Sequence, residues 1–131
     1  TRMTRLREFV VSLEEGLGGG FPVYAVRMGG AVIVGVPAEA FTDFQIELRR
    51  RFPDIAVVVT NDTNGTYNYL PPAAYYGNGA YEQDCADFGP GALEIVTTEA
   101  SRLIRGLLAD SGPEMHADSQ PVARQDRYTW A

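Results

Sequence analysis

Glu39 and a run of tyrosines are the side chains in this sequence whose chemistry extends beyond packing. Five of the seven tyrosines lie within the 22 residues from Asn61 to Glu82. A carboxylate beside phenol oxygens is a hard-oxygen donor set that can bind a metal ion, and a bound cation lowers the pKa of a coordinating phenol or water. Alternatively, a free phenol can donate a hydrogen bond to a developing oxyanion. The residue types leave both chemistries open.

The tyrosine-rich segment is too irregular to be a helix or an ordinary strand. Pro71 and Pro72 remove two backbone donors, and Gly65, Gly77 and Gly79 relax the backbone. The segment is also longer than the roughly 4–6 residues of a typical connection. Two interpretations remain: a surface loop whose rings pack over the edge of the core, and a binding loop.

The elements around this segment predict that Glu39 and the tyrosines meet. Residues 31–36 and 55–60 are apolar runs typical of buried strands, and the first is apolar on both faces, as in a strand covered on both sides. Residues 42–52 between them are expected to be a helix. If the strands are parallel, with a right-handed crossover, their carboxyl ends share one sheet edge. Glu39 follows the first strand and the tyrosines follow the second, so both should face one cleft there.

The helix over 42–52 is expected to begin with a capping box. Thr42 is placed as the N-cap with Gln45 at N3, and Phe41 and Ile46 have the spacing of a hydrophobic staple. Three apolar residues should be buried along this helix: Phe44, Leu48 and Phe52. A carboxylate at Glu39 could simply favour the helix dipole, by about 0.3–1 kcal/mol. Because Asp43 and Gln45 already serve the helix terminus, a role for Glu39 in a pocket is favoured.

The remaining elements complete an α/β pattern. Residues 3–16 have helical spacing of apolar residues, ended by three glycines at 18–20, and two strands over 22–28 and 31–36 form a hairpin through Gly29-Gly30. A further helix follows residues 89–91. Its expected apolar stripe comprises Ile95, Val96, Ala100, Leu103, Ile104, Leu107 and Leu108. The predicted fold is a mixed β-sheet with a hairpin, a β-α-β unit and flanking helices, forming one part of a larger layered α/β domain.

Composition excludes several classes of function. The net charge of −6 argues against a nucleic-acid partner, and no apolar run reaches the length of a membrane span. The single cysteine, Cys85, excludes an internal disulfide or a cysteine-based metal cluster, and is expected to be a small, buried or half-buried thiol. The single histidine, His116, is expected to be solvated in a polar tail. No signal peptide is visible, and the cellular compartment stays open.

Three stretches resemble the neutral/alkaline (non-lysosomal) ceramidase family. They are FPVYAVRMGGAVIVGVPAEAF, TNDTNGTYNYLPPAAYYGNGAYE and FGPGALEIVTTEASRLIRGL, which together span about two thirds of the chain. The distinctive features are Pro-x-Glu after a strand, two tyrosines twelve residues apart, a Tyr-Glu pair and a Gly-Pro before a helix. Asn68 stands where the family often has glycine. The resemblance identifies residues 1–109 as the C-terminal portion of a ceramidase-like catalytic domain, followed by a polar tail over 110–131.

The resemblance implies a zinc-dependent hydrolase that cleaves the N-acyl bond of ceramide-like lipids. It places zinc ligands at Glu39 and Tyr69 and the group that stabilises the tetrahedral intermediate at Tyr81. The histidines that complete the zinc site in this family have no counterpart in this sequence, so the isolated chain is expected to be inactive. The upstream portion of the same protein, or a partner chain, is expected to supply them.

A second class of function stays open from the residues alone. The tyrosine-rich loop could belong to a non-catalytic module that binds a sugar or a small apolar ligand, since aromatic rings suit both. A third interpretation is structural, with the loop filling an interface to another chain. An exposed sheet edge and apolar surface would favour association in either case, and a homo-oligomer is one form it could take.

Overall fold

The hairpin predicted between residues 22 and 36 forms the centre of the fold. In the computed structural model, which describes residues 6–11 and 20–109, β2 (Phe21–Met28) and β3 (Ala31–Gly35) pair antiparallel through Gly29 and Gly30. Gly29 has a φ of 58°, in the left-handed region that favours glycine. This confirms the prediction of a hairpin.

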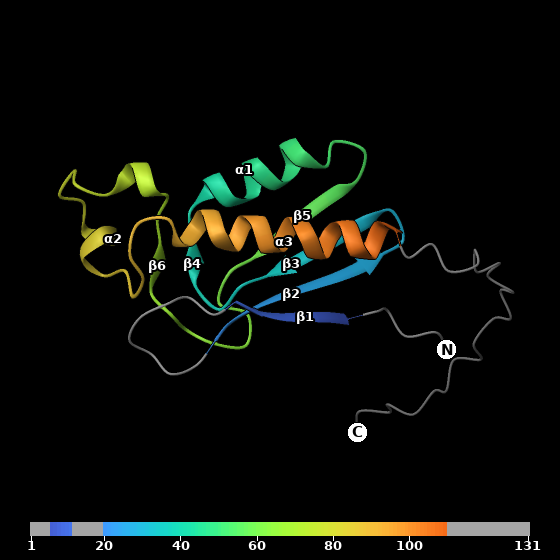
Figure 1. The fold of residues 1–131 in the computed structure, drawn as a ribbon, viewed down its shortest axis with the longest axis horizontal. Helices are drawn as coiled ribbons and strands as arrows, with labels where there is room; N and C mark the ends of the chain where they lie inside the picture. Colours follow the sequence, from blue (N-terminus) through green and yellow to red (C-terminus); the bar gives the residue numbers. More distant parts are fainter. Residues whose placement is uncertain (1–5, 12–19, 110–131) are drawn as a thin grey trace, which may run out of the picture.

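The predicted β-α-β unit is also present. Strand β5 (Ala56–Thr60) pairs parallel with β3, and α1 (Thr42–Arg51) connects the two strands. Strand β1 (Leu6–Val11) pairs antiparallel with β2, so the strand order is β1-β2-β3-β5 (Figure 1). The second long helix, α3 (Ala92–Ala109), lies against β2 and β1, while α1 lies against β5 and α3. The chain is therefore the mixed α/β fold that the sequence predicted.

The helix predicted over residues 3–16 is wrong. Residues 6–11 form β1, in a register that runs from Leu6 opposite Val26 to Val11 opposite Phe21. The run LREFVV contains residues that favour strands, and an available edge on β2 outweighs the helical spacing. The rest of that prediction, and the glycines at 18 and 19, lie outside the described residues, as do His116 and the tail.

The start of α1 differs from the predicted capping box. Phe41, not Thr42, is the N-cap, and no side chain caps the helix. Ile46 is 60% exposed, so it forms no staple; instead the Phe41 ring packs against Tyr75, with centroids 4.8 Å apart. The predicted burial along the helix is confirmed for three residues: Phe44, Leu48 and Phe52.

Helix α3 has the predicted apolar stripe, apart from one residue. Ile95 is 48% exposed, because it lies on the side of the helix that faces away from the sheet. The buried members of the stripe are Val96, Ala100, Leu103, Ile104 and Leu107. None of the helices in the described part of the chain has both the length and the apolar content that a membrane span requires.

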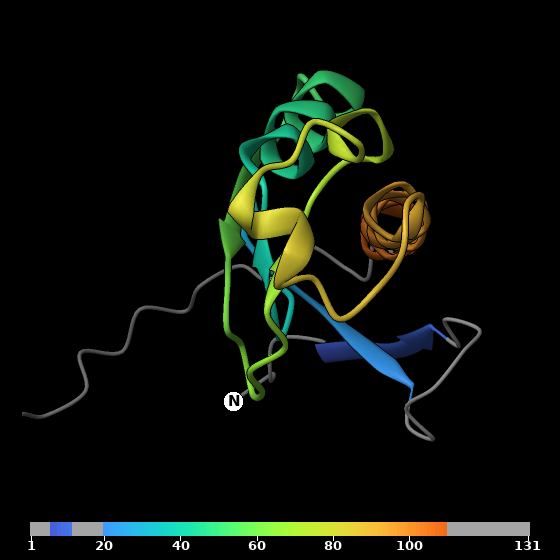
Figure 2. The same cartoon turned by 90° about the vertical axis from the view of Figure 1, so that its left-hand side faces the viewer.

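The sheet is covered on one face by the described residues. Both helices lie on the same side of it (Figure 2), over the alternate residues Val23, Ala25, Val32, Val34 and Val57. The opposite face, which we call the open face, comprises Val26, Met28, Ala31, Ile33, Ala56 and Val58, aligned across three strands. Cover on both sides was expected for residues 31–36; within the described residues Ala31 and Ile33 of β3 are only partly buried on the open face, and on the neighbouring strands Met28 and Val58 are 58% and 44% exposed.

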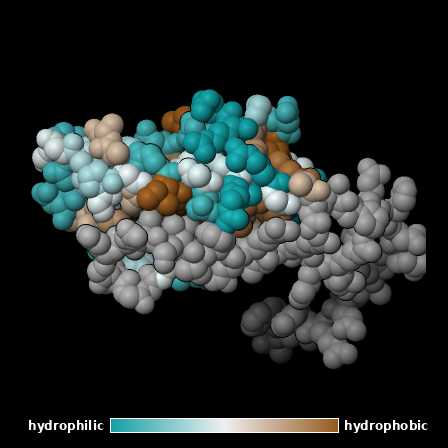
Figure 3. Space-filling view, viewed as in Figure 1, coloured by the Kyte–Doolittle hydropathy of each residue, from teal (hydrophilic) through white to brown (hydrophobic). Residues whose placement is uncertain are grey.

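The side of the molecule that carries the helices is more polar than the open face of the sheet. In Figure 3 it is mostly hydrophilic, with hydrophobic patches that are separated from one another. Scattered exposed apolar residues of this kind are normal on a soluble surface, whereas a contiguous apolar sheet face marks a packing or interaction surface.

The open face is closed at one end by the loop after β5. A Cβ atom at Gly35 would lie 2.8 Å from both Oγ1 and Cγ2 of Thr63. Thr63 has little freedom to move, because its hydroxyl bonds to the Thr60 hydroxyl at 2.9 Å and to the Thr60 carbonyl at 3.2 Å. Only glycine at position 35 therefore lets this loop lie against the strand.

We expect Gly35→Ala to lower the free energy of unfolding by about 1–3 kcal/mol, as overpacking does. The matched control is Gly30→Ala, because no heavy atom lies within 4 Å of a Cβ at Gly30. Urea unfolding followed by circular dichroism measures both variants. Equal stabilities of the two variants would contradict the close contact between Thr63 and β3.

Candidate functional site

Glu39 and Tyr69 are brought together by a second, two-stranded sheet. Strand β4 (Glu39–Ala40) pairs parallel with β6 (Tyr69–Leu70), with Glu39 opposite Tyr69. The backbone N–H of Glu39 donates to the carbonyl of Asn68 at 3.2 Å, and that of Phe41 donates to Leu70 at 3.3 Å. The two predicted ligand residues are thus neighbours just beyond the carboxyl ends of β3 and β5, where the topology predicted that they would meet.

Three of the five tyrosines in the loop make packing contacts. The ring of Tyr67 stacks on Phe21 at 5.5 Å, and Tyr75 packs edge-on against Phe41. The hydroxyl of Tyr76 donates to the carbonyl of Phe88 at 2.7 Å, and burial raises the pKa of this phenol. These contacts fix the loop against the core.

The other two tyrosines face each other. Tyr81 is the first residue of α2 (Tyr81–Asp84), and its ring centroid lies 6.0 Å from that of Tyr69. The Tyr81 side chain is 68% exposed, so it contributes little burial. The pKa of the Tyr81 phenol is raised, first by a hydrogen bond with Cys85 and the charge of that side chain, and then by Tyr69. Cys85 itself is half-buried, as the sequence predicted.

The Tyr69 phenol lies in a field of negative charge. The Glu39 carboxylate is the main reason that the pKa of Tyr69 is raised, because it disfavours the phenolate. Partial loss of solvent contributes next, followed by the charges of Glu82 and Cys85 and by hydrogen bonding to Glu39. The sequence assigned no role in the site to Glu82 or Cys85; Glu82 directly follows Tyr81 and Cys85 lies four residues after it, and this proximity to Tyr81 could have placed both near the site.

The donor set offered by the described residues is incomplete for a metal ion. The Glu39 carboxylate and the Tyr69 phenol are two adjacent oxygen donors of the hard type that suits a divalent cation. Among residues 6–11 and 20–109, no group of three His, Cys, Asp or Glu side chains could hold a metal ion. Glu39 and Tyr69 fit one side of a metal site, and a bound metal ion would need further ligands from outside the described residues.

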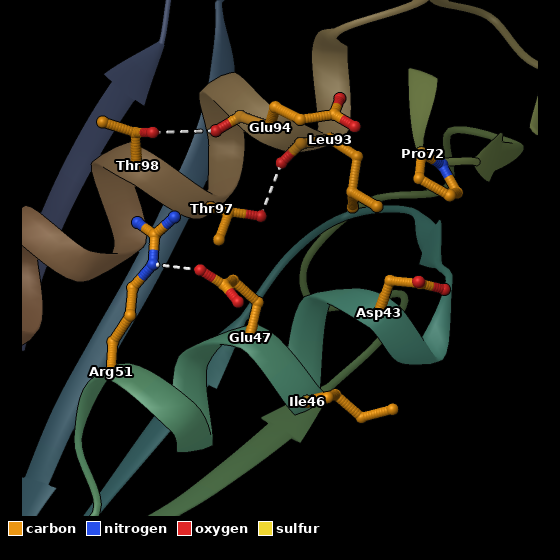
Figure 4. Close-up of a pocket in the computed structure, with 9 residues that line it drawn as sticks. All are labelled: Asp43, Ile46, Glu47, Arg51, Pro72, Leu93, Glu94, Thr97 and Thr98. Atoms are coloured by element: carbon orange, nitrogen blue, oxygen red, sulfur yellow. Dashed lines mark hydrogen bonds and ion pairs between the residues drawn. The ribbon is translucent and has the colours of Figure 1, made fainter. Parts of the chain in front are cut away.

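A separate pocket lies between α1 and the start of α3. It has a volume of about 350 Å³ and contains none of the three predicted site residues (Figure 4). Two of its carboxylates already have partners: Glu47 pairs with Arg51 at 2.8 Å, and Glu94 accepts a hydrogen bond from the Ala73 backbone at 2.8 Å. Hydrogen bonds from Arg50 and Arg51 hold the pKa of Glu47 at about 2. This pocket is explained by contacts that join α1, α3 and the loop.

Comparison with known proteins supports the fold class. No protein-family model matches the chain, and no curated protein matches it. Among solved structures, a ceramidase described as complexed with C2 is similar, with a TM-score of 0.58 and 19% sequence identity. The similarity covers 67% of this chain and 15% of the ceramidase chain. At this identity the likeness concerns the fold, so the chain has a ceramidase-like fold that spans a small part of the length of the protein it matches.

We expect Glu39→Gln to lower the pKa of Tyr69 toward its ordinary value in the metal-free chain, because the largest cause of the shift is removed. Tyrosinate absorbance followed against pH measures the change, and Tyr69→Phe identifies the transition. Glu94→Gln is the control, since Glu94 acts on Tyr76 instead. An unchanged Tyr69 transition in Glu39→Gln would show that the two side chains do not interact.

Proposed function

We propose that this chain is part of a zinc-dependent amide hydrolase that acts on the N-acyl bond of ceramide-like lipids. In this proposal Glu39 and Tyr69 hold zinc, and Tyr81 stabilises the tetrahedral intermediate. The observation that carries the proposal is the pairing of β4 with β6, which places Glu39 opposite Tyr69 and leaves Tyr81 facing them. The ceramidase-like fold and the sequence motifs support the same assignment.

Each of the three residues has a distinct role in the proposed reaction. A bound zinc ion would supply Lewis acidity for the attack of water on the amide carbonyl. The Glu39 and Tyr69 oxygens would bind the ion from neighbouring strands. A tyrosine phenol is protonated at neutral pH, and the raised pKa of Tyr81 favours that form further, so its hydroxyl is available to donate a hydrogen bond to the developing oxyanion.

The proposal requires a larger assembly than the described residues. Residues 1–109 would be the C-terminal portion of the catalytic domain, and the upstream portion of the same protein or a partner chain would supply the histidine ligands. The open face supports this view, because an apolar sheet face of this kind needs a further layer over it.

The alternative function is a non-catalytic module that binds a sugar or a small apolar ligand. Packing of Tyr67, Tyr75 and Tyr76 reduces the ring surface available to such a ligand. The exposed ring of Tyr81 is the observation that favours it. This alternative predicts ligand binding that needs no metal and that survives Glu39→Gln.

We expect the isolated chain to show no amidase activity and a longer product that carries the histidines to be active. In that product, Tyr81→Phe should lower kcat/KM for a fluorescent N-acyl sphingosine by roughly 10²–10³, as expected for loss of one oxyanion donor. Zinc content should be unchanged in Tyr81→Phe and reduced in Glu39→Gln. Metal analysis and the amidase assay on each variant make these measurements.

The control is Tyr24→Phe, which removes a hydroxyl on β2, outside the proposed site. Full activity of Tyr81→Phe would exclude the oxyanion role. A histidine-containing product that is active without bound zinc would exclude the metal assignment. Metal-independent binding of a sugar or an apolar ligand would instead support the alternative.

A further inference from the structure

Asp87 holds the residue that immediately precedes Tyr69. Its Oδ2 atom accepts a hydrogen bond from the backbone N–H of Asn68 at 2.8 Å, and both carboxylate oxygens lie 3.2 Å from Asn68 Nδ2. Hydrogen bonds to a charged carboxylate are stronger than those between neutral groups. Asn68 is thus held through its backbone and its side chain by one carboxylate.

The same residue is held from its other side by β4. The carbonyl of Asn68 accepts the N–H of Glu39 at 3.2 Å. Asn68 therefore lies between Asp87 and Glu39, and its position determines where the adjoining Tyr69 begins β6. No glycine could make the bonds that the Asn68 side chain makes to Asp87.

Asp87 is itself carried by a fixed part of the chain. The next residue, Phe88, packs edge-on against Phe21 at 5.4 Å and against Tyr67 at 5.1 Å. Helix α2, which begins with Tyr81, ends at Asp84, and three residues separate its end from Phe88. The bond between Asp87 and Asn68 therefore joins the segment that carries Tyr81 to the strand that carries Tyr69.

We propose that Asp87 is a positioning residue that sets the separation between Tyr69 and Tyr81. The inference concerns geometry, and its catalytic meaning rests on the proposed function of these two tyrosines. Asp87 need not hold the fold as a whole, because other contacts anchor the loop. Tyr76 bonds to the Phe88 carbonyl, Gln83 accepts from the Gly77 N–H at 2.6 Å, and Leu70 is fully buried.

The test uses the full 131-residue chain and the variant Asp87→Ala. Nuclear magnetic resonance measures the cross-relaxation between the Tyr69 and Tyr81 rings and the hydrogen exchange of the Asn68 amide. We expect the ring contact to be lost and Asn68 exchange to accelerate roughly tenfold or more, as for loss of one charge-assisted hydrogen bond. The thermal unfolding midpoint should stay close to that of the unchanged chain.

Two further variants separate positioning from other effects. Asp87→Asn keeps an oxygen that can accept from the Asn68 N–H, so it should restore part of the ring contact. Asp84→Ala removes the same charge from α2, and Asp84 is exposed, so it should leave the ring contact intact. Partial rescue by asparagine is a result that a purely electrostatic role would not give.

Retention of the ring contact in Asp87→Ala overturns the proposal. Loss of the contact together with a large fall in the unfolding midpoint also overturns it, since Asp87 would then be a general stabilising residue. Loss of the contact in Asp84→Ala assigns the effect to charge rather than to the bond, and overturns it as well. None of these measurements involves zinc or amide hydrolysis, so failure of the proposed function would leave their outcome unchanged.

Discussion

The candidate site depends on a very short piece of backbone pairing. Two residues of β4 lie beside two residues of β6, held by hydrogen bonds from Glu39 to Asn68 and from Phe41 to Leu70. An isolated pair of two-residue strands would not be stable in water. This pair persists because Leu70 is fully buried and Phe41 packs against Tyr75. The position of Tyr69 relative to Glu39 is therefore set by burial of Leu70, by the packing of Phe41 and by the hydrogen bonds of Asn68.

The sheet has an uncovered face, and the proposed metal site lacks ligands within the described residues. The β-α-β unit brings the ends of β3 and β5 to one edge, and there the chain presents two oxygen donors. On the open face the sheet presents aliphatic rows that no described element covers. A larger layered domain would remove both deficits, because another layer could cover the sheet and carry further ligands to its edge.

Sequence patterns predicted the parts of the fold that local chemistry determines. The Gly29-Gly30 turn, the parallel unit and the burial of Phe44 and Leu48 all follow from spacing. Residues 6–11 could not be predicted in this way, because their pairing with β2 is a tertiary contact that overrides a helical pattern. The cap of α1 was missed for a similar reason, because the Phe41 ring packs against Tyr75 and the expected partner, Ile46, is exposed.

The same distinction applies to the candidate site. That Glu39 and the loop meet follows from parallel topology, which can be inferred from pattern. The influence of Glu82 on Tyr69 and the hold of Asp87 on Asn68 depend on how α2 folds back against β6. The spacing of apolar residues in the sequence does not predict that α2 lies next to β6. The departure from glycine at position 68 was visible in the sequence, but its reason is visible only in the bonds to Asp87.

The division of the five tyrosines is itself an argument for function. Ordering a long loop costs conformational entropy for every residue that is fixed, and the packing of Tyr67, Tyr75 and Tyr76 offsets part of that cost. Tyr81 offsets little of this entropy cost. The residue is 68% exposed, although its backbone is part of α2. A purely structural loop would gain stability by turning that ring inward or by replacing it with a small polar residue. An ordered, exposed phenol beside a second phenol and a carboxylate is the arrangement that the proposed oxyanion role of Tyr81 requires.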